Sequence, residues 1–225
     1  MRSTFCRPYS EEFARRCILK CFPEFEWKLS LNEQDPPDII DEEEKVGIEV
    51  VSDVRQIDAE LSNTYAQYKG RPISEVPEKL INKFKENKAG LGCDSDGLVI
   101  SAGSVGGWTY KDIQDCITAK TEKLNKPNYD QSTVDALFIN NSGGLCFEDY
   151  LQMIARGDCF SDDKQRQFQM IFIYYSRKVY LCDVVKNSVT HRCLKDDEVS
   201  GLIKDSLYAI GRGEEYQKQS EFLLH

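Results

Sequence analysis

The stretch DPPDIIDEEEKVGIEVV, residues 35–51, predicts a β-hairpin around which the rest of the chain is organised. Two short apolar runs rich in β-branched residues flank the acidic turn 41–44, a pattern typical of two antiparallel strands with a tight connection. Each run carries one carboxylate, Asp38 in the first and Glu49 in the second. A carboxylate among apolar neighbours needs a cation, a basic partner or a raised pKa, so we expect the pair to share one of these.

Strand geometry predicts that the two carboxylates lie together. Side chains alternate between the faces of a strand, so Glu49 points away from the face that Ile48 and Val50 share. Asp38 on the partner strand then lies across from Glu49, close enough for both to hold one divalent cation. Mg²⁺ or Mn²⁺ is the expected ion because these ions prefer oxygen ligands, and the backbone carbonyl of Val50 is the expected third ligand.

At these residues the sequence resembles the PD-(D/E)xK nuclease superfamily, which has the restriction-endonuclease-like fold. Its motif is a Pro-Asp at the start of one strand and, after a short hairpin, an acidic residue, any residue and a lysine. Here Pro37-Asp38 and Glu49-Val50-Val51 stand at these places. The resemblance implies that Asp38 and Glu49 hold a metal ion and take part in catalysis. The chain departs from the motif at Val51, where the superfamily has the lysine that positions or activates the attacking water.

In some members of the superfamily a group from a neighbouring element replaces that lysine. Candidates here are Gln67 and Lys69 on the following helix and Lys28 on the preceding strand, although each also suits an ordinary solvated surface. Glu11 and Glu12, in the first turn of the first expected helix, could add a carboxylate to the site, as in some relatives, and Glu12 is the expected metal ligand. As a first-turn acid it also stabilises the helix dipole and needs no other role.

The order of predicted elements agrees with this resemblance. Apolar periodicity indicates a helix over residues 10–22, a strand over 25–31, the two hairpin strands, and a helix over 58–69. The nuclease fold builds its core in this order. We therefore expect an α/β fold with a mixed central sheet flanked by helices, of the restriction-endonuclease-like type, as a single domain over 1–211 with a C-terminal tail over 212–225.

The rest of the chain predicts further helices and strands. Helices are expected over 76–88, 110–125, 147–156 and 198–210, and strands over 134–139, 170–175 and 179–185. The Gly-rich stretch 90–107 indicates a short strand or loop between flexible connections. Four lysines are expected on the outward face of the helix over 110–125, where they either bind phosphates or form an ordinary solvated face: Lys111, Lys120, Lys123 and Lys126.

Composition limits the class of protein. The net charge is −9, with 29 Lys and Arg against 38 Asp and Glu, which is the wrong sign for a protein that coats nucleic acid. No apolar run is long enough to cross a membrane, and the N-terminus lacks an apolar signal segment. Nine cysteines without paired spacing fit free thiols in a reduced compartment, so we expect a cytoplasmic protein without a membrane partner.

Two functions remain. The first is a Mg²⁺- or Mn²⁺-dependent nuclease acting on DNA or RNA, with Asp38, Glu49, the Val50 carbonyl and Glu12 around the ion. Gln67 or Lys69 would then orient the water. The second is a catalytically inactive acidic binding protein of the same fold, such as an immunity or antitoxin protein that neutralises a basic nuclease toxin. The partner is nucleic acid in the first and a basic protein in the second, and a homodimer is compatible with both.

Overall fold

The computed structural model describes residues 7–33, 36–52, 56–104, 110–127, 129, 134–141, 148–160 and 166–211. The chain divides into two compact units, one formed by residues 1–52 and 108–225 and the other by residues 53–107. The single domain expected over 1–211 thus spans two compact units, and each is described by itself. The expected tail over 212–225 lies outside the described residues.

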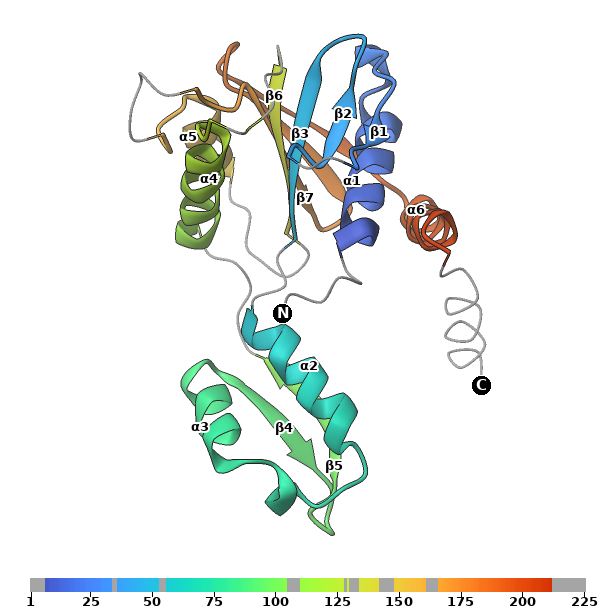
Figure 1. Ribbon diagram of the computed structural model, residues 1–225, viewed down its shortest axis with the longest axis vertical. Helices are drawn as coiled ribbons and strands as arrows, with labels where there is room; N and C mark the ends of the chain where they lie inside the picture. The colour runs from blue at the N-terminus through green and yellow to red at the C-terminus, as the bar shows by residue number, and fades with distance from the viewer. Residues whose placement is uncertain are drawn as a thin grey trace. The chain divides into compact units, whose positions relative to one another are not determined.

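The first unit is built on a seven-stranded sheet in the order β1-β2-β3-β6-β7-β8-β9 (Figure 1). Its strands are β1 (Ser30–Leu31), β2 (Ile39–Asp41), β3 (Val46–Ser52), β6 (Val134–Asn140), β7 (Met170–Tyr175), β8 (Lys178–Asp183) and β9 (Ser188–Cys193). The central strands β3, β6 and β7 are parallel, and the other neighbouring pairs are antiparallel. The predicted α/β class with a mixed central sheet is confirmed.

Helices cover both faces of this sheet (Figure 1). On one face lie α1 (Arg7–Cys21) and α6 (Asp196–Ala209), and on the other lie α4 (Tyr110–Leu124) and α5 (Glu148–Ala155). Strand β6 shows the division: Phe138 packs on the α1 side, whereas Leu137 and Ile139 pack on the α4 side. The parallel centre is therefore buried on both faces, as such sheets usually are.

The turn between β2 and β3 is closed by a buried carboxylate. The side chain of Asp41 accepts hydrogen bonds from the backbone N–H groups of Lys28 at 2.5 Å, Glu43 at 3.0 Å and Glu44 at 3.1 Å. Burial by itself would raise the pKa of Asp41, but the hydrogen bonds from Glu44, Lys28 and Glu43 lower it below its usual value. The acidic turn is thus a structural element that fixes the hairpin.

The second unit is smaller. It contains α2 (Gln56–Tyr68), the 3₁₀ turn η2 (Ile73–Glu75), α3 (Glu78–Glu86), and an antiparallel pair formed by β4 (Ala89–Cys93) and β5 (Val99–Ser104). Its core consists of Leu61, Phe84 and Ala89.

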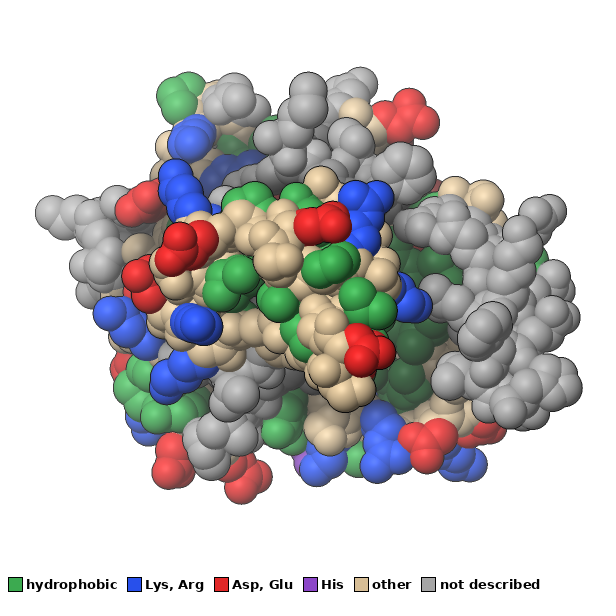
Figure 2. Space-filling model, turned by 90° about the horizontal axis from the view of Figure 1, so that it is seen from below, with side chains coloured by type: hydrophobic (Ala, Val, Ile, Leu, Met, Phe, Trp, Pro, Cys, Tyr) green, Lys and Arg blue, Asp and Glu red, His purple; other side chains and the backbone are tan. Residues whose placement is uncertain are grey.

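Seen from below, the described side chains in Figure 2 mix basic and acidic groups instead of gathering one sign. No helix in the described part of the chain has both the length and the apolar character needed to cross a membrane.

The prediction of a strand over residues 25–31 is mostly wrong. Only β1, at its end, pairs with a neighbour, because the chain first forms the 3₁₀ turn η1 (Pro23–Phe25). The rings of Phe25 and Trp27 stack with centroids 4.4 Å apart, and both meet the ring of Phe172 edge-on at 6.4 Å. The alternating apolar residues therefore pack against the sheet without belonging to a long strand.

Two strands were not predicted. Strand β4 contains Gly90 and Gly92, which carry no β-branched signal, and β9 is a largely exposed edge strand with few apolar residues. Edge strands have only one partner and often lack an apolar pattern, so periodicity does not find them.

The centre of the sheet should dominate stability. Phe138 lies in the middle of β6 without solvent exposure, and Phe138→Ala is expected to lower the free energy of unfolding by about 3–5 kcal/mol because it leaves a cavity. Urea denaturation measures the change. Val185→Ala, at a side chain that is 71% exposed, is the control and should change stability by less than about 0.5 kcal/mol. Similar losses in both variants would contradict the described core.

Candidate active site

Asp38 and Glu49 point to the face of the sheet that α4 covers. Their neighbours Ile39 and Ile48 are cross-strand partners and pack on the α1 side, so alternation turns the two carboxylates to the other side. Glu49 is 0% exposed and Asp38 is 3% exposed. The two acids therefore lie on one face of adjacent strands, the placement that strand alternation predicts.

Asp38 is held in place by the end of the hairpin ladder. Its backbone N–H donates to the carbonyl of Ile48 at 3.1 Å, and its Oδ2 accepts the backbone N–H of Val50 at 2.7 Å. Asn32 fastens the preceding turn, since its N–H donates to the Asp38 carbonyl and its amide to the Pro37 carbonyl, both at 2.9 Å. The carboxylate of Asp38 thus takes a main-chain donor of β3 and is fixed beside Glu49.

Two ammonium groups from α4 compensate the charge of Glu49. The Nζ of Lys120 lies 2.5 Å from Oε2, and the Nζ of Lys123 lies 2.8 Å from Oε1 and 3.0 Å from Oε2. The lysine side chains are 23% and 30% exposed, so they extend from the surface to a buried carboxylate. The expectation that Lys120 and Lys123 face outward is wrong, because both flank the buried stripe of α4 that includes Ile117 and Thr121.

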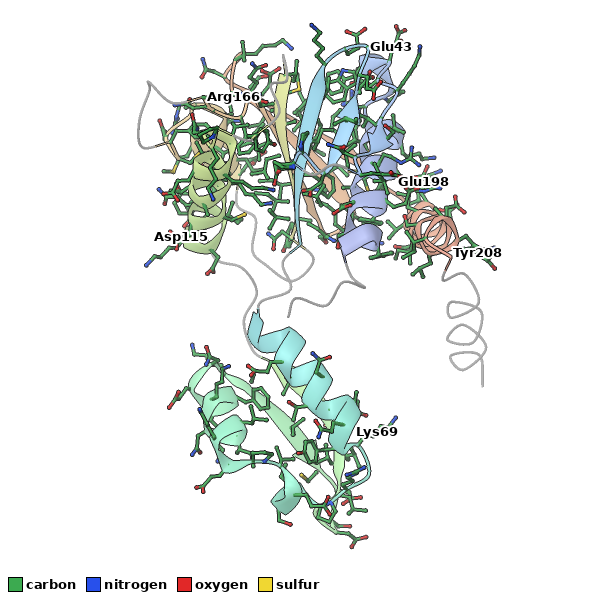
Figure 3. The ribbon with its side chains drawn as sticks, in the orientation of Figure 1. Glu43, Lys69, Asp115, Arg166, Glu198 and Tyr208 are labelled. Carbon is green, nitrogen blue, oxygen red and sulfur yellow. The ribbon has the colours of Figure 1, made fainter. Side chains whose placement is uncertain are left out.

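A second ion pair lies on the next strand. Asp135 of β6 is buried, and its oxygens accept hydrogen bonds from Arg166 Nε at 2.5 Å and Nη2 at 2.6 Å. Arg166 is labelled in Figure 3 beside α4. The amide of Asn125, just after α4, holds the Arg166 backbone through its Nδ2 at 2.8 Å and its Oδ1 at 3.0 Å. Burial raises the pKa of Asp135, and the guanidinium of Arg166 opposes this shift.

Tyr129 connects the two ion pairs. Its side chain donates a hydrogen bond to the carboxylate of Glu49, and the guanidinium carbon of Arg166 lies 5.6 Å from its ring centroid. Burial, followed by the charges of Glu49 and Asp135, raises the pKa of Tyr129 well above its usual value. The phenol therefore keeps its proton at neutral pH and serves as a donor.

These side chains form a compact group that we call the acidic-basic cluster: Asp38, Glu49, Asp135, Lys120, Lys123, Arg166 and Tyr129. Its carboxylates and cations balance in charge when all are ionised. The cations come from α4 and from the segment before β7, whereas the acids come from the sheet. The cluster is thus a place where buried acids meet bases that remain partly open to solvent.

Asp38 and Glu49 offer two carboxylates, which are ligands of the kind that a magnesium ion prefers. Mg²⁺ is usually bound in proteins through one or two carboxylates and keeps several waters or phosphate oxygens as its other ligands. Two ammonium groups already compensate the charge of Glu49, so a divalent ion can bind there only by displacing at least one of them. In the described part of the chain, no three His, Cys, Asp or Glu side chains converge as a metal-binding group, so carboxylate ligands would number two. Val50, whose carbonyl is the expected third ligand, lies in β3 opposite Phe138 of β6.

The structure does not bring Glu12 to this pair. It lies on α1, which packs on the other face of the sheet, and its oxygens accept hydrogen bonds from Arg15 at 2.8 Å and Arg16 at 2.6 Å. Burial would raise the pKa of Glu12, but the bonds from Arg15 and then Arg16 lower it below its usual value. These contacts give Glu12 a structural role without a metal.

Of the three candidates for the missing lysine, two belong to the second unit and the third, Lys28, belongs to the first. Gln67 and Lys69 belong to the second unit, at the end of α2, and both are exposed (Figure 3 labels Lys69). The Nζ of Lys69 lies 5.8 Å from the ring centroid of Tyr65. Lys28 pairs at 2.6 Å with Glu43 on the exposed turn of the hairpin.

Sequence reasoning missed Asp135, Arg166 and Tyr129. Asp135 had a usable signal, because it is a single acid within the apolar run over residues 134–139, as Glu49 is within its own strand. Arg166 and Tyr129 had no usable sequence signal, because they lie in connecting segments and only the folded structure brings them close to Glu49 and Asp135.

Comparison of the chain with protein-family models, with curated proteins and with solved structures gives no match. The chemistry of the site therefore has to follow from its own residues and their geometry.

The lysines should stabilise Glu49 strongly. Lys120→Met combined with Lys123→Met is expected to lower the free energy of unfolding by about 3–5 kcal/mol, because it leaves a buried carboxylate without a countercharge. Urea denaturation measures this loss, and adding Glu49→Gln should recover most of it. The control pair Lys111→Met and Lys126→Met removes two exposed lysines at and beyond the ends of α4 and should have little effect. Equal stability of the two double variants would contradict the described compensation.

The ion pairs of Glu12 should make its contribution depend on pH. A carboxylate whose pKa is lowered by folding stabilises the protein above its unfolded pKa, and this stability is lost as the pH falls through the folded pKa. Glu12→Gln is therefore expected to destabilise the protein at neutral pH, and the difference from the wild type should shrink at pH of about 3. The urea midpoints of the wild type and Glu12→Gln at both pH values measure this difference. Glu42→Gln, at an exposed carboxylate, is the control. A loss independent of pH would rule out the ion pairs as its source.

Proposed function

We propose that the protein is a Mg²⁺- or Mn²⁺-dependent nuclease that hydrolyses phosphodiester bonds in DNA or RNA. The observation that carries the proposal is the pairing of Asp38 and Glu49 on one face of adjacent strands, with Lys120 of α4 in contact with Glu49. In this reading α4 supplies the basic group that the sequence lacks at Val51.

The arrangement of elements supports the resemblance to the PD-(D/E)xK superfamily. The chain runs through α1, β1, β2, β3 and α2, with Asp38 directly before β2 and Glu49 inside β3. A helix and three strands, with one acid just before the second strand and one inside the third, follow the order that the resemblance implies, whereas the helix expected next, α2, belongs to the second unit. The sheet is mixed and is covered on both faces, which suits the same fold.

Each residue of the site then has a role. Asp38 and Glu49 would hold the ion through their carboxylate oxygens, and the ion would make a nearby water more acidic and stabilise negative charge on the phosphate. The ammonium of Lys120 orients the attacking water, and that of Lys123 attracts a phosphate oxygen. Both side chains reach solvent, so they can turn from Glu49 to the substrate.

Local charge explains how an acidic chain can take an anionic substrate. The acidic-basic cluster is balanced by itself, so a divalent ion adds two positive charges. A phosphodiester and a hydroxide together supply two negative charges. The site thus favours an anion although the net charge of the chain is −9.

The alternative, an inactive acidic binding protein such as an immunity or antitoxin protein, is favoured by the net charge of −9. In that reading Lys120 and Lys123 are permanent countercharges of Glu49, and a basic protein binds elsewhere on the surface. The partly exposed Lys120 and Lys123 beside Glu49 favour the nuclease, because cations at this position would repel a basic partner.

An activity screen tests the proposal. Purified protein with Mg²⁺ or Mn²⁺ is expected to cut at least one of plasmid, single-stranded DNA and RNA. Asp38→Asn and Glu49→Gln should remove the activity, and Lys120→Met should lower the rate about 10²-fold or more. Lys111→Met, at an exposed lysine on the same helix, should leave the rate unchanged.

Circular dichroism of each variant separates lost activity from lost folding. Absence of cleavage by the wild type on all three substrates with both ions would refute the nuclease and favour the binding protein. Cleavage that survives both Asp38→Asn and Glu49→Gln would place the active site elsewhere.

A further inference from the structure

Glu49 has more hydrogen-bond donors than it can keep when it binds an ion. Lys120 and Lys123 make three contacts with its two oxygens, and Tyr129 donates to the same carboxylate. A carboxylate has about four lone-pair sites. A cation that coordinates Glu49 must therefore displace at least one of these donors.

The donors differ in how firmly they are held. The lysines have long side chains that are 23% and 30% exposed, and water can replace the carboxylate as their partner. Tyr129 is only 5% exposed, and its ring has few rotatable bonds. The lysines are thus the donors that can leave.

Tyr129 is held in place by a chain of contacts through Arg166. Arg166 lies against its ring at 5.6 Å, and the guanidinium of Arg166 is held by both oxygens of Asp135 at 2.5 Å and 2.6 Å. The backbone of Arg166 is in turn bound by the side chain of Asn125. Few movements of Tyr129 are compatible with all of these contacts.

We propose that Tyr129 is a positioning residue that keeps the carboxylate of Glu49 oriented toward a divalent ion when the ammonium groups of Lys120 and Lys123 are displaced. This inference rests on the proposed function, because it concerns the same ion. Tyr129 touches neither the ion nor the substrate and acts through Glu49. Asp135, Arg166 and Asn125 contribute by holding Tyr129.

Metal binding without nucleic acid tests this role. In calorimetric titration with Mn²⁺, Tyr129→Phe is expected to raise the Kd about 10-fold or more, as losses of residues that orient metal ligands usually do. Tyr65→Phe is the matched control, since it also loses one tyrosine hydrogen bond, to the carbonyl of Ile100 at 3.1 Å, but within the second unit. This control should bind Mn²⁺ as the wild type does.

The kinetics separate positioning from substrate binding. In the cleavage assay Tyr129→Phe should lower kcat at limiting Mn²⁺, recover at high Mn²⁺, and leave the KM for nucleic acid unchanged. A wild-type Kd for Mn²⁺ in Tyr129→Phe, while Asp38→Asn abolishes binding, would overturn the inference and leave the proposed function standing. A wild-type protein that neither binds Mn²⁺ nor cleaves would overturn both.

A spectroscopic measurement covers the case in which Tyr129→Phe does not fold. Rearrangement of the donors around Glu49 changes the hydrogen bond of a buried phenol, so Mn²⁺ should produce a tyrosine difference spectrum in the wild type. The signal should be lost in Asp38→Asn, which retains all 11 tyrosines of the chain. Mn²⁺ binding without any tyrosine difference signal would overturn the inference.

Discussion

The first unit depends on how the charge of Glu49 is compensated inside the sheet. A carboxylate without solvent exposure in a central strand is costly unless opposite charge lies directly beside it. Lys120 and Lys123 supply that charge, and in doing so they fix α4 against β3. The contact therefore links a buried acid in the strand to the packing of the helix, because the ammonium groups that allow burial of Glu49 also hold α4 against the sheet.

The neighbouring strand repeats this arrangement. Asp135 on β6 is neutralised by Arg166 from outside the sheet, as Glu49 on β3 is neutralised from α4. Tyr129 lies between the two pairs and contacts both. Buried acids whose partners come from different elements thus form one connected polar network inside the first unit.

The sequence allowed some of this to be predicted. Residues 35–51 predicted the hairpin and the placement of Asp38 and Glu49, because alternation is a local property of strands and one acid in an apolar run is conspicuous. The partners of Glu49 could not be found in this way: Lys120 is 71 residues away, and a lysine at the edge of a helical stripe can face either solvent or sheet. The aromatic residues near Trp27 misled for a similar reason, since alternating apolar residues also suit an irregular segment packed on Phe172.

The separation of Glu49 from its lysines along the chain also bears on the order of assembly. The contacts to Lys120 and Lys123 close loops of 71 and 74 residues, which include the whole of the second unit. Closing so long a loop costs entropy and is slow compared with forming the hairpin next to it. Until α4 docks, Glu49 must stay hydrated, so this face of β3 cannot become dry. During synthesis Glu49 therefore stays hydrated until Lys120 and Lys123 have been made and α4 has packed on the sheet. The complete acidic-basic cluster forms late in folding.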